Sequence, residues 1–168
     1  IVFIQDYSLF RAIGVSLFHS VASFNNAGFD IFGGGQSMVP YADNIFLNII
    51  TCVLIFFGGI GFLVIQELWQ KKCQWKKLSM HTKVVLSVSL TLIIIGTLLI
   101  KLTEPVSWLC ALFHSVSTRT AGFASRPIGD FGAPALLVMI VLMFIGASSG
   151  STGGGIKTST FFVLIRGI

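Results

Sequence analysis

The chain reads FHSVASFNNAGF over residues 18–29 and FHSVSTRTAGF over residues 113–123. Both copies begin with Phe-His-Ser-Val and end with Ala-Gly-Phe, and the second copy is one residue shorter. Self-similarity at a separation of about ninety residues indicates one structural unit that is used at least twice. We expect the function to lie where the two copies meet.

The composition is that of a membrane protein. Hydrophobic residues make up 54% of the chain and charged residues 10%, against about 25% charged residues in soluble proteins. Mean hydropathy is +0.91. The net charge of +5 does not indicate nucleic-acid binding, because the basic residues are not interleaved with aromatic ones. Several gather instead in one polar stretch: Lys71, Lys72, Lys76, Lys77 and Lys83. Residues 71–83 are therefore predicted to form a cytoplasmic loop.

The sequence gives little support to an enzyme. Its cysteines, Cys52, Cys73 and Cys110, have neither a metal-binding spacing nor an obvious disulfide pairing. It has no Ser/His/Asp order and no paired carboxylates within the apolar segments. We therefore predict a protein that is not an enzyme and that binds no cofactor.

The first copy of the repeat is predicted to occupy residues 1–70. Residues 8–23 are too few and too polar to cross a hydrocarbon core of about 30 Å, but they are long enough for a re-entrant half-helix. An irregular segment is expected at 24–30, and a transmembrane span at 41–69. Small residues in that span allow another backbone to approach closely: Gly58, Gly59 and Gly61.

The second copy is predicted to occupy residues 84–168 and to be complete. Its expected parts are a span at 84–102, a half-helix at 106–117, an irregular segment at 118–123, and a span at 133–168 that is broken by a glycine-rich loop at 146–157. The unit is thus span, half-helix, irregular segment, span, and the first copy lacks its first span. The predicted fold class is an all-α, polytopic membrane protein, of which this chain is expected to be an internal part.

Irregular backbone at membrane depth indicates a pore or a buried site, because lipid cannot satisfy its N–H and C=O groups. Selectivity filters use such backbone, with carbonyl oxygens replacing the hydration shell of a cation. Gly28 and Gly122 suit this task, since glycine permits the dihedral angles that turn carbonyls toward an axis. The carbonyl ends of the half-helices add partial negative charge. A cation pathway follows, and Arg119 is expected to point away from it.

Three ordered motifs carry a family resemblance: FNNAGFD at residues 24–30, TRTAGF at 118–123 and GSTGGGIKT at 150–158. Together they resemble the Trk/Ktr/HKT superfamily of cation transporters, and within it the KtrB-type (NtpJ-type) membrane subunit. The resemblance implies four repeats around one potassium pathway, with Gly28 in the second repeat and Gly122 in the third. K⁺ is then expected to bind backbone carbonyls around these glycines, in a filter formed by Asn25, Asn26, Ala27, Gly28, Thr118, Thr120, Ala121 and Gly122.

The glycine-rich stretch at 146–157 admits several interpretations. A phosphate-binding loop fails on spacing, because Ile156 separates Gly155 from Lys157. A flexible break between two helix halves stays open. The family resemblance implies a gate below the filter, formed by Gly150, Ser151, Thr152, Gly153, Gly154, Gly155 and Lys157. The lysine either pairs with acidic groups or acts as an electrostatic barrier, and the sequence does not choose between these roles.

The resemblance also implies a place and partners. A multi-pass protein of the bacterial plasma membrane is expected, with the filter loops facing outside, forming a homodimer of full-length chains with a ring of cytosolic nucleotide-binding regulatory subunits (KtrA/TrkA-like). The loop at 71–83 faces the compartment of that ring, although anionic lipid is an equal claimant. Na⁺ is a candidate coupling or activating ion.

Alternatives to potassium uptake stay open at this point. They are a non-transporting regulatory or assembly subunit with re-entrant loops, an Na⁺-selective HKT-like transporter, and a channel built from two copies of a two-loop chain. His19 and His114 occupy equivalent places in the half-helices. We expect them to pack or to hydrogen-bond behind the filter rather than to bind a metal.

Overall fold

The protein is built from helices. The computed structural model describes residues 2–32 and 34–167, and these contain no β-strand. The α-helices are α1 (Leu9–Phe24), α2 (Ile45–Ile60), α3 (Phe62–Gln70), α4 (Met80–Thr103), α5 (Trp108–Thr120), α6 (Ala133–Phe144) and α7 (Thr158–Arg166). Short 3-10 helices lie at Val2–Ile4, Val39–Tyr41, Trp75–Lys77 and Ile128–Asp130. The predicted all-α fold class is confirmed. Ile1, Gly33 and Ile168, which the predicted repeats include, lie outside the described residues.

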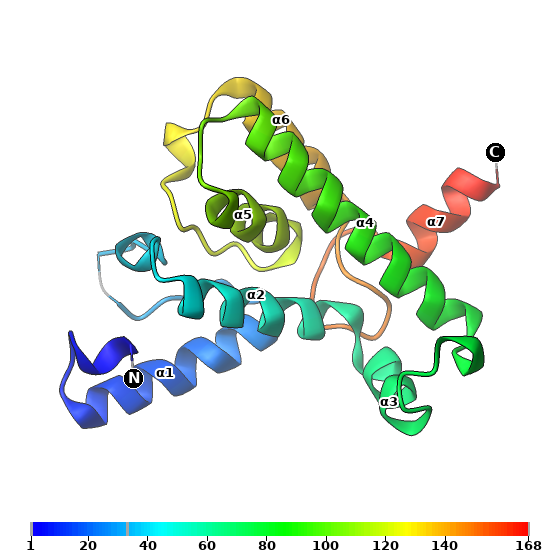
Figure 1. The fold of residues 1–168 in the computed structure, drawn as a ribbon, viewed down its shortest axis with the longest axis horizontal. Coiled ribbons are helices and arrows are strands. Elements are labelled where there is room, and N and C mark those ends of the chain that lie inside the picture. The colour runs from blue at the N-terminus through cyan, green and yellow to red at the C-terminus, as the bar shows by residue number, and fades with distance from the viewer. Residues whose placement is uncertain (1, 33, 168) are drawn as a thin grey trace.

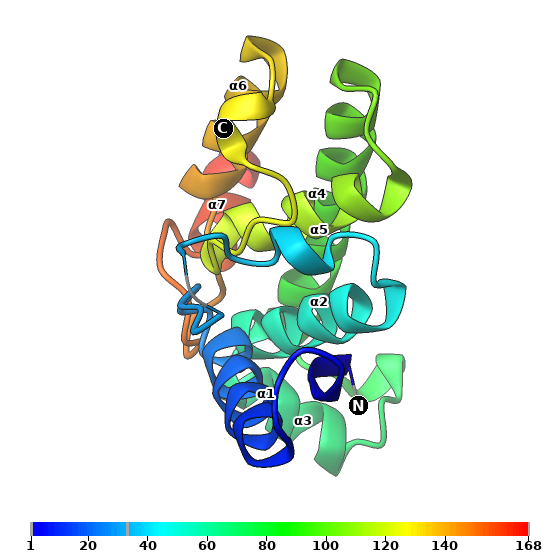
Figure 2. The same cartoon turned by 90° about the vertical axis from the view of Figure 1, so that its left-hand side faces the viewer.

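Helix α5 packs against helices from both copies of the repeat. α1 lies alongside α2, while α4, α5 and α6 pack against one another (Figure 1). In Figure 2, α4 and α6 stand side by side above α1 and α2. One apolar core includes side chains from α1, α2 and α5, among them Val15, Ile55, Phe113 and Val116. A second core fills the space between α4, α5 and α6. The end of α5 is thus held against both copies.

Helix α4 has the length and composition of a transmembrane helix. It contains 24 residues and so measures about 36 Å, enough for a hydrocarbon core of about 30 Å. The bent pair α2 and α3 is a second candidate span in the described part of the chain. Large apolar side chains lie on the outside of the molecule, including Phe10 and Leu102, which are 88% and 81% exposed. Such a surface is suited to lipid or to further protein.

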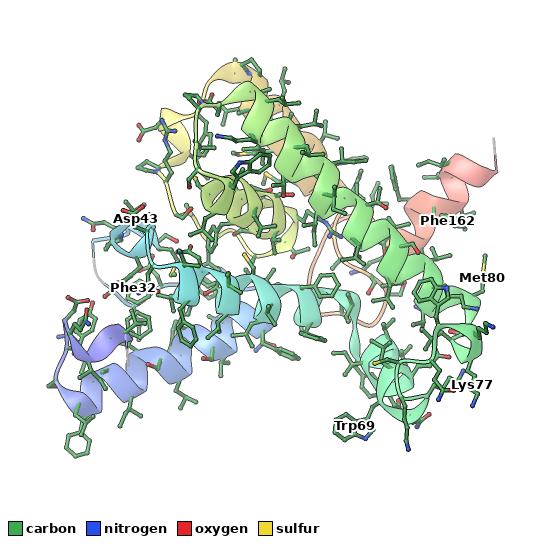
Figure 3. The ribbon with its side chains drawn as sticks, in the orientation of Figure 1. Phe32, Asp43, Trp69, Lys77, Met80 and Phe162 are labelled. Atoms are coloured by element: carbon green, nitrogen blue, oxygen red, sulfur yellow. The ribbon has the colours of Figure 1, made fainter. Side chains whose placement is uncertain are left out.

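Helix α4 begins earlier than the span predicted at 84–102. The hydroxyl of Ser79 accepts a hydrogen bond from the Thr82 N–H at 3.3 Å, and the Glu67 carboxylate accepts one from the Ser79 N–H at 2.8 Å. These bonds satisfy free donors at the start of the helix. The basic loop therefore ends at Ser79, and Figure 3 shows Trp69, Lys77 and Met80 around this corner.

The span predicted at 41–69 is not one continuous helix. It divides into α2 and α3, whose axes differ by 96° at Gly61. Gly61 has φ +89°, which an α-helix does not use. Helix α2 starts at Ile45, where the Asn44 side chain accepts a hydrogen bond from the Leu47 N–H at 3.0 Å. The sequence prediction missed the break because Gly58, Gly59 and Gly61 indicated only close packing.

Helix α1 lies close to its predicted bounds, whereas α5 begins and ends later than predicted. α1 covers Leu9–Phe24, against a prediction of 8–23. α5 covers Trp108–Thr120, against a prediction of 106–117. The residues Thr118, Arg119 and Thr120, predicted to be irregular, form the last turn of α5. The Thr118 hydroxyl donates to the His114 carbonyl at 2.6 Å, as a threonine inside a helix does. The irregular part of the second motif is therefore shorter than expected.

Candidate functional site

The first predicted filter loop leaves the C-terminal end of α1. The Asn25 N–H donates to the Val21 carbonyl at 2.9 Å and the Ala27 N–H to the Ala22 carbonyl at 2.9 Å, which closes the helix. Asn26 and Gly28 then take φ values of +52° and +68°. Asparagine tolerates this left-handed region better than most residues, and glycine adopts it freely. The chain therefore turns sharply at the carbonyl end of a half-helix.

The side chains of the two asparagines have different partners. The Asn25 amide donates to the Val21 carbonyl at 2.9 Å, within its own helix. Asn26 is 7% exposed. With its amide nitrogen turned inward, it donates to the carbonyls of Ser23 at 3.3 Å and Ile55 at 3.1 Å, while its oxygen accepts from the Gly59 N–H at 3.3 Å. Asn26 thus ties the first loop to α2.

The second predicted filter loop leaves the C-terminal end of α5 in a similar way. The N–H groups of Ala121 and Gly122 both donate to the Ser117 carbonyl at 2.9 Å, and Gly122 has φ +84°. The Ser117 hydroxyl donates to the Phe123 carbonyl at 2.6 Å. Ser117 therefore holds the loop on both sides of the glycine.

The structure brings the two loops into contact. A Cβ atom added to Gly28 would overlap the carbonyl oxygen of Ala121, so that these two backbones touch. A Cβ atom added to Gly122 would meet nothing within 4 Å. Beyond the loops, the Met38 N–H donates to the Ala124 carbonyl at 2.9 Å, and the Ala124 N–H donates to the Ser37 hydroxyl at 3.0 Å. These longer-range bonds fix the two copies of the motif relative to each other, and no signal in the sequence pointed to Ser37.

Arg119 points away from both loops, as expected. Its guanidinium donates to the Gly146 carbonyl at 3.1 Å and to the Ser89 carbonyl at 3.5 Å. Gly146 is the first residue of the predicted glycine-rich loop, and Ser89 belongs to α4. Arg119 therefore links the second filter helix to the loop that follows α6.

The two histidines lie in α1 and α5, the helices that precede the two loops. His19 Nε2 is 2.9 Å from the Thr51 hydroxyl, and its ring centroid is 5.1 Å from that of Phe123. His114 is fully buried, with its ring centroid 4.8 Å from that of Phe131, and neither ring nitrogen has a hydrogen-bond partner in the described structure. Within residues 2–32 and 34–167, no group of three His, Cys, Asp or Glu residues could hold a metal ion.

The glycine-rich stretch forms a compact hairpin between α6 and α7. The Gly146 N–H donates to the Ile156 carbonyl at 3.0 Å, the Ile156 N–H to the Phe144 carbonyl at 3.1 Å, and the Ala147 N–H to the Gly154 carbonyl at 3.0 Å. A Cβ atom at Gly146 would overlap the Gly154 carbonyl oxygen, so this pairing requires glycine. The orange loop in Figure 1 extends from α6 toward the end of α2 and returns to α7.

The tip of this loop contacts the ends of both half-helices. The Thr152 hydroxyl donates to the carbonyl of Phe24, the last residue of α1, at 3.1 Å. A Cβ atom at Gly153 would lie 2.8 Å from Cγ2 of Thr120, the last residue of α5. The Lys157 ammonium donates to the Gly153 carbonyl at 2.8 Å. Three of the predicted gate residues thus gather beside the two filter loops.

The arrangement suits a cation. Two helices end at adjacent loops with their carbonyl ends, which carry partial negative charge. Backbone carbonyls beside two glycines are the kind of group that cation filters use.

Comparisons with known proteins agree with this geometry. A family model described as a cation transport protein, TrkH, matches residues 3–104 and 75–168. The Ktr system potassium uptake protein B of Vibrio alginolyticus is 44% identical over 164 residues, covering 88% of this chain and 35% of that protein. The potassium/sodium uptake protein NtpJ of Enterococcus hirae is 36% identical over 176 residues, covering 98% of this chain and 38% of that protein.

A solved structure has the same fold. The crystal structure of the potassium transporter TrkH from Vibrio parahaemolyticus superposes with a TM-score of 0.70 at 22% sequence identity, over 93% of this chain and 38% of that one. The chain therefore spans little more than a third of the proteins that it matches.

Proposed function

The chain belongs to the TrkH family of cation transport proteins, and we propose that it forms two neighbouring walls of a potassium uptake pathway. The observation that carries this proposal is the backbone contact between Gly28 and Ala121, at the meeting point of two helix C-termini. In the proposed filter, K⁺ binds backbone carbonyls around Gly28 and Gly122. The side chains of Asn25, Asn26, Thr118 and Thr120 support that backbone from behind.

We propose further that the hairpin at 146–157 is the gate of this pathway. Its support is the position of Thr152 and Gly153 against the last residues of α1 and α5. Lys157 places a positive charge beside the same point through its bond to the Gly153 carbonyl. A fixed cation there repels K⁺, which favours the role of an electrostatic barrier over pairing with an acidic group.

The wider assignments follow from the relatives. Uptake of K⁺ is the function in the name of the Vibrio alginolyticus protein, and NtpJ is named for both potassium and sodium. We propose K⁺ as the transported ion and Na⁺ as a candidate second ion, with transport rather than catalysis as the activity. Homodimers of the full-length chain, with a ring of cytosolic nucleotide-binding subunits, are the proposed assembly. The loop from Lys71 to Ser79 faces the cytoplasm in this proposal.

The test is growth at low potassium. The full-length gene is expressed in a bacterium that lacks its own K⁺ uptake, either as wild type or with Gly122→Ser, and growth is recorded against K⁺ concentration. Wild type is expected to restore growth, and Gly122→Ser is expected to require more K⁺. Absence of rescue by a wild-type protein that reaches the membrane would reject transport and favour a regulatory or assembly subunit.

The gate has its own test. In the full-length protein, replacing Gly153, Gly154 and Gly155 with alanine is expected to change the rate of K⁺ uptake, because the hairpin can no longer fold against the half-helices. Unchanged uptake and unchanged regulation would reject the gate while leaving the filter proposal intact.

A further inference from the structure

The bend between α2 and α3 leaves backbone groups without helical partners. In a continuous helix, the carbonyls of Gly58, Gly59 and Ile60 would accept hydrogen bonds from the N–H groups four residues later. The 96° bend at Gly61 prevents this. Buried carbonyls without partners are costly at membrane depth, so these groups need donors from elsewhere.

The hairpin at 146–157 supplies those donors. Ser148 donates through its N–H to the Gly59 carbonyl at 3.0 Å, and its hydroxyl bonds the carbonyls of Gly59, at 3.1 Å, and Ile60. Thr152 donates through its N–H to the Gly58 carbonyl at 3.4 Å. In return, the Phe62 N–H at the start of α3 donates to the Gly150 carbonyl at 3.0 Å.

The glycines at the bend make room for the hairpin. Gly61 has φ +89°, and a Cβ atom there would lie 2.8 Å from the Ser149 carbonyl oxygen and 3.1 Å from that of Gly150. A Cβ atom at Gly58 would overlap the Phe24 carbonyl and lie 3.3 Å from the Thr152 hydroxyl oxygen. Ser148 is fully buried within this contact.

Proline does not cause the bend. Sharp kinks arise at proline, at glycine, or where a polar group enters the helical hydrogen-bond ladder. Residues 45–70 contain no proline. Glycine weakens a helix by about 1 kcal/mol per residue relative to alanine but does not impose a direction. The inserted groups are those of Ser148 and Thr152.

We infer that Ser148 and Thr152 are positioning residues that seat the gate in the Gly61 bend, and that withdrawal of the hairpin joins α2 and α3 into one helix. This inference rests on the proposed gate. It adds that α2 and α3, which belong to the other copy of the repeat, rearrange when the hairpin moves. While the hairpin is seated, it completes the hydrogen bonds of the bent α2 and α3. When it leaves, a continuous helix is the arrangement that satisfies the same carbonyls.

The inference is tested by a distance measured across the bend. In the full-length protein, Cys52, Cys73 and Cys110 are replaced by serine, and spin labels are attached at Ile45→Cys and Trp69→Cys, whose native side chains are 63% and 88% exposed. With 1.5 Å per residue, the bent pair gives a label separation of about 26 Å, and one continuous helix gives about 36 Å. K⁺ uptake is measured on the same samples.

Ser148→Ala combined with Thr152→Val is expected to shift the separation toward about 36 Å and to raise K⁺ uptake. Raised uptake with the separation unchanged would overturn the inference and leave the gate proposal standing. A longer separation with unchanged uptake would support the seat and reject the gate.

Gly61→Ala offers an independent variant with a matched control. Alanine disfavours φ +89° and would crowd the Ser149 carbonyl, so the longer separation is expected again. Gly35→Ala changes a glycine with a similar φ of +65° that has no neighbour within 4 Å, and it is expected to keep the short separation. A short separation in Gly61→Ala would overturn the inference.

Discussion

The two copies of the repeated motif have similar turns but different supports. The loop after α1 is held by the Asn26 side chain on α2, and the histidine behind it bonds Thr51. The loop after α5 is held by the Ser117 hydroxyl, and Arg119 ties its helix to the glycine-rich hairpin. The two copies therefore meet the glycine-rich hairpin in different ways: the first through the Phe24 carbonyl, which accepts from the Thr152 hydroxyl, and the second through a charged side chain, Arg119, which bonds the first residue of the hairpin.

The largest expected effect is the loss of K⁺ uptake when a glycine of either loop, Gly28 or Gly122, is replaced by alanine. Gly28→Ala places a methyl group against the Ala121 carbonyl and strains a residue with φ +68°. Gly122→Ala suffers only the strain of φ +84°, because nothing lies within 4 Å. Backbone strain of this kind costs about 1–3 kcal/mol. We expect Gly28→Ala to lower the maximal rate of K⁺ uptake about a hundredfold, and Gly122→Ala about tenfold.

Uptake of a radioactive potassium analogue, Rb⁺, by cells expressing equal amounts of each full-length variant makes this comparison. Equal losses for the two substitutions would show that the contact between the loops carries no weight in transport.

A smaller effect is expected when Arg119 is replaced. This residue lies two residues before Ala-Gly-Phe in the second motif, the place that Asn25 occupies in the first. Arg119→Gln removes bonds to the carbonyls of Gly146 and Ser89, and hydrogen bonds from a charged group contribute about 1.5–3 kcal/mol. The hairpin is then held less firmly. If it is the gate, we expect K⁺ leak to rise about tenfold.

Asn25→Ala is the matched control, because the Asn25 side chain bonds only the Val21 carbonyl of its own helix. Leak is measured as Rb⁺ efflux from loaded proteoliposomes. Similar leak in the two variants would show that the Arg119 bonds do not restrain the hairpin.

The smallest expected effect concerns the two histidines. Thr51→Val removes the hydrogen-bond partner of His19, at a cost of about 1 kcal/mol. His114→Leu replaces a buried ring that has no hydrogen-bond partner in the described structure, and it is expected to change stability by less than about 0.5 kcal/mol. Thermal unfolding of the purified full-length protein in detergent ranks the two variants. A larger loss for His114→Leu would contradict this ranking.

The repeat predicted the outline of the site from sequence. It predicted the helices α1 and α5 and the glycine turns that follow them, because a motif of apolar positions followed by Ala-Gly-Phe is encoded locally. It misplaced the end of α5, since Thr118 and Thr120 are compatible with either a helix or a loop and tertiary packing decided between them.

The bend at Gly61 lay beyond local sequence reasoning. It depends on Ser148 and Thr152, which lie about ninety residues further along the chain. Three closely spaced glycines indicated that another backbone would approach α2, and that prediction was correct. Nothing local specified which backbone approaches or that α2 would end there.

The KM for K⁺ in single and double filter variants tests the central claim most directly. Gly28→Ser, Gly122→Ser and the double variant of the full-length protein are compared with wild type by Rb⁺ uptake. If both loops form one ion pathway, each single substitution raises the KM, and the double variant departs from the product of the single effects, as coupled residues do. An unchanged KM in either single variant, or independent effects in the double variant, would contradict a shared filter.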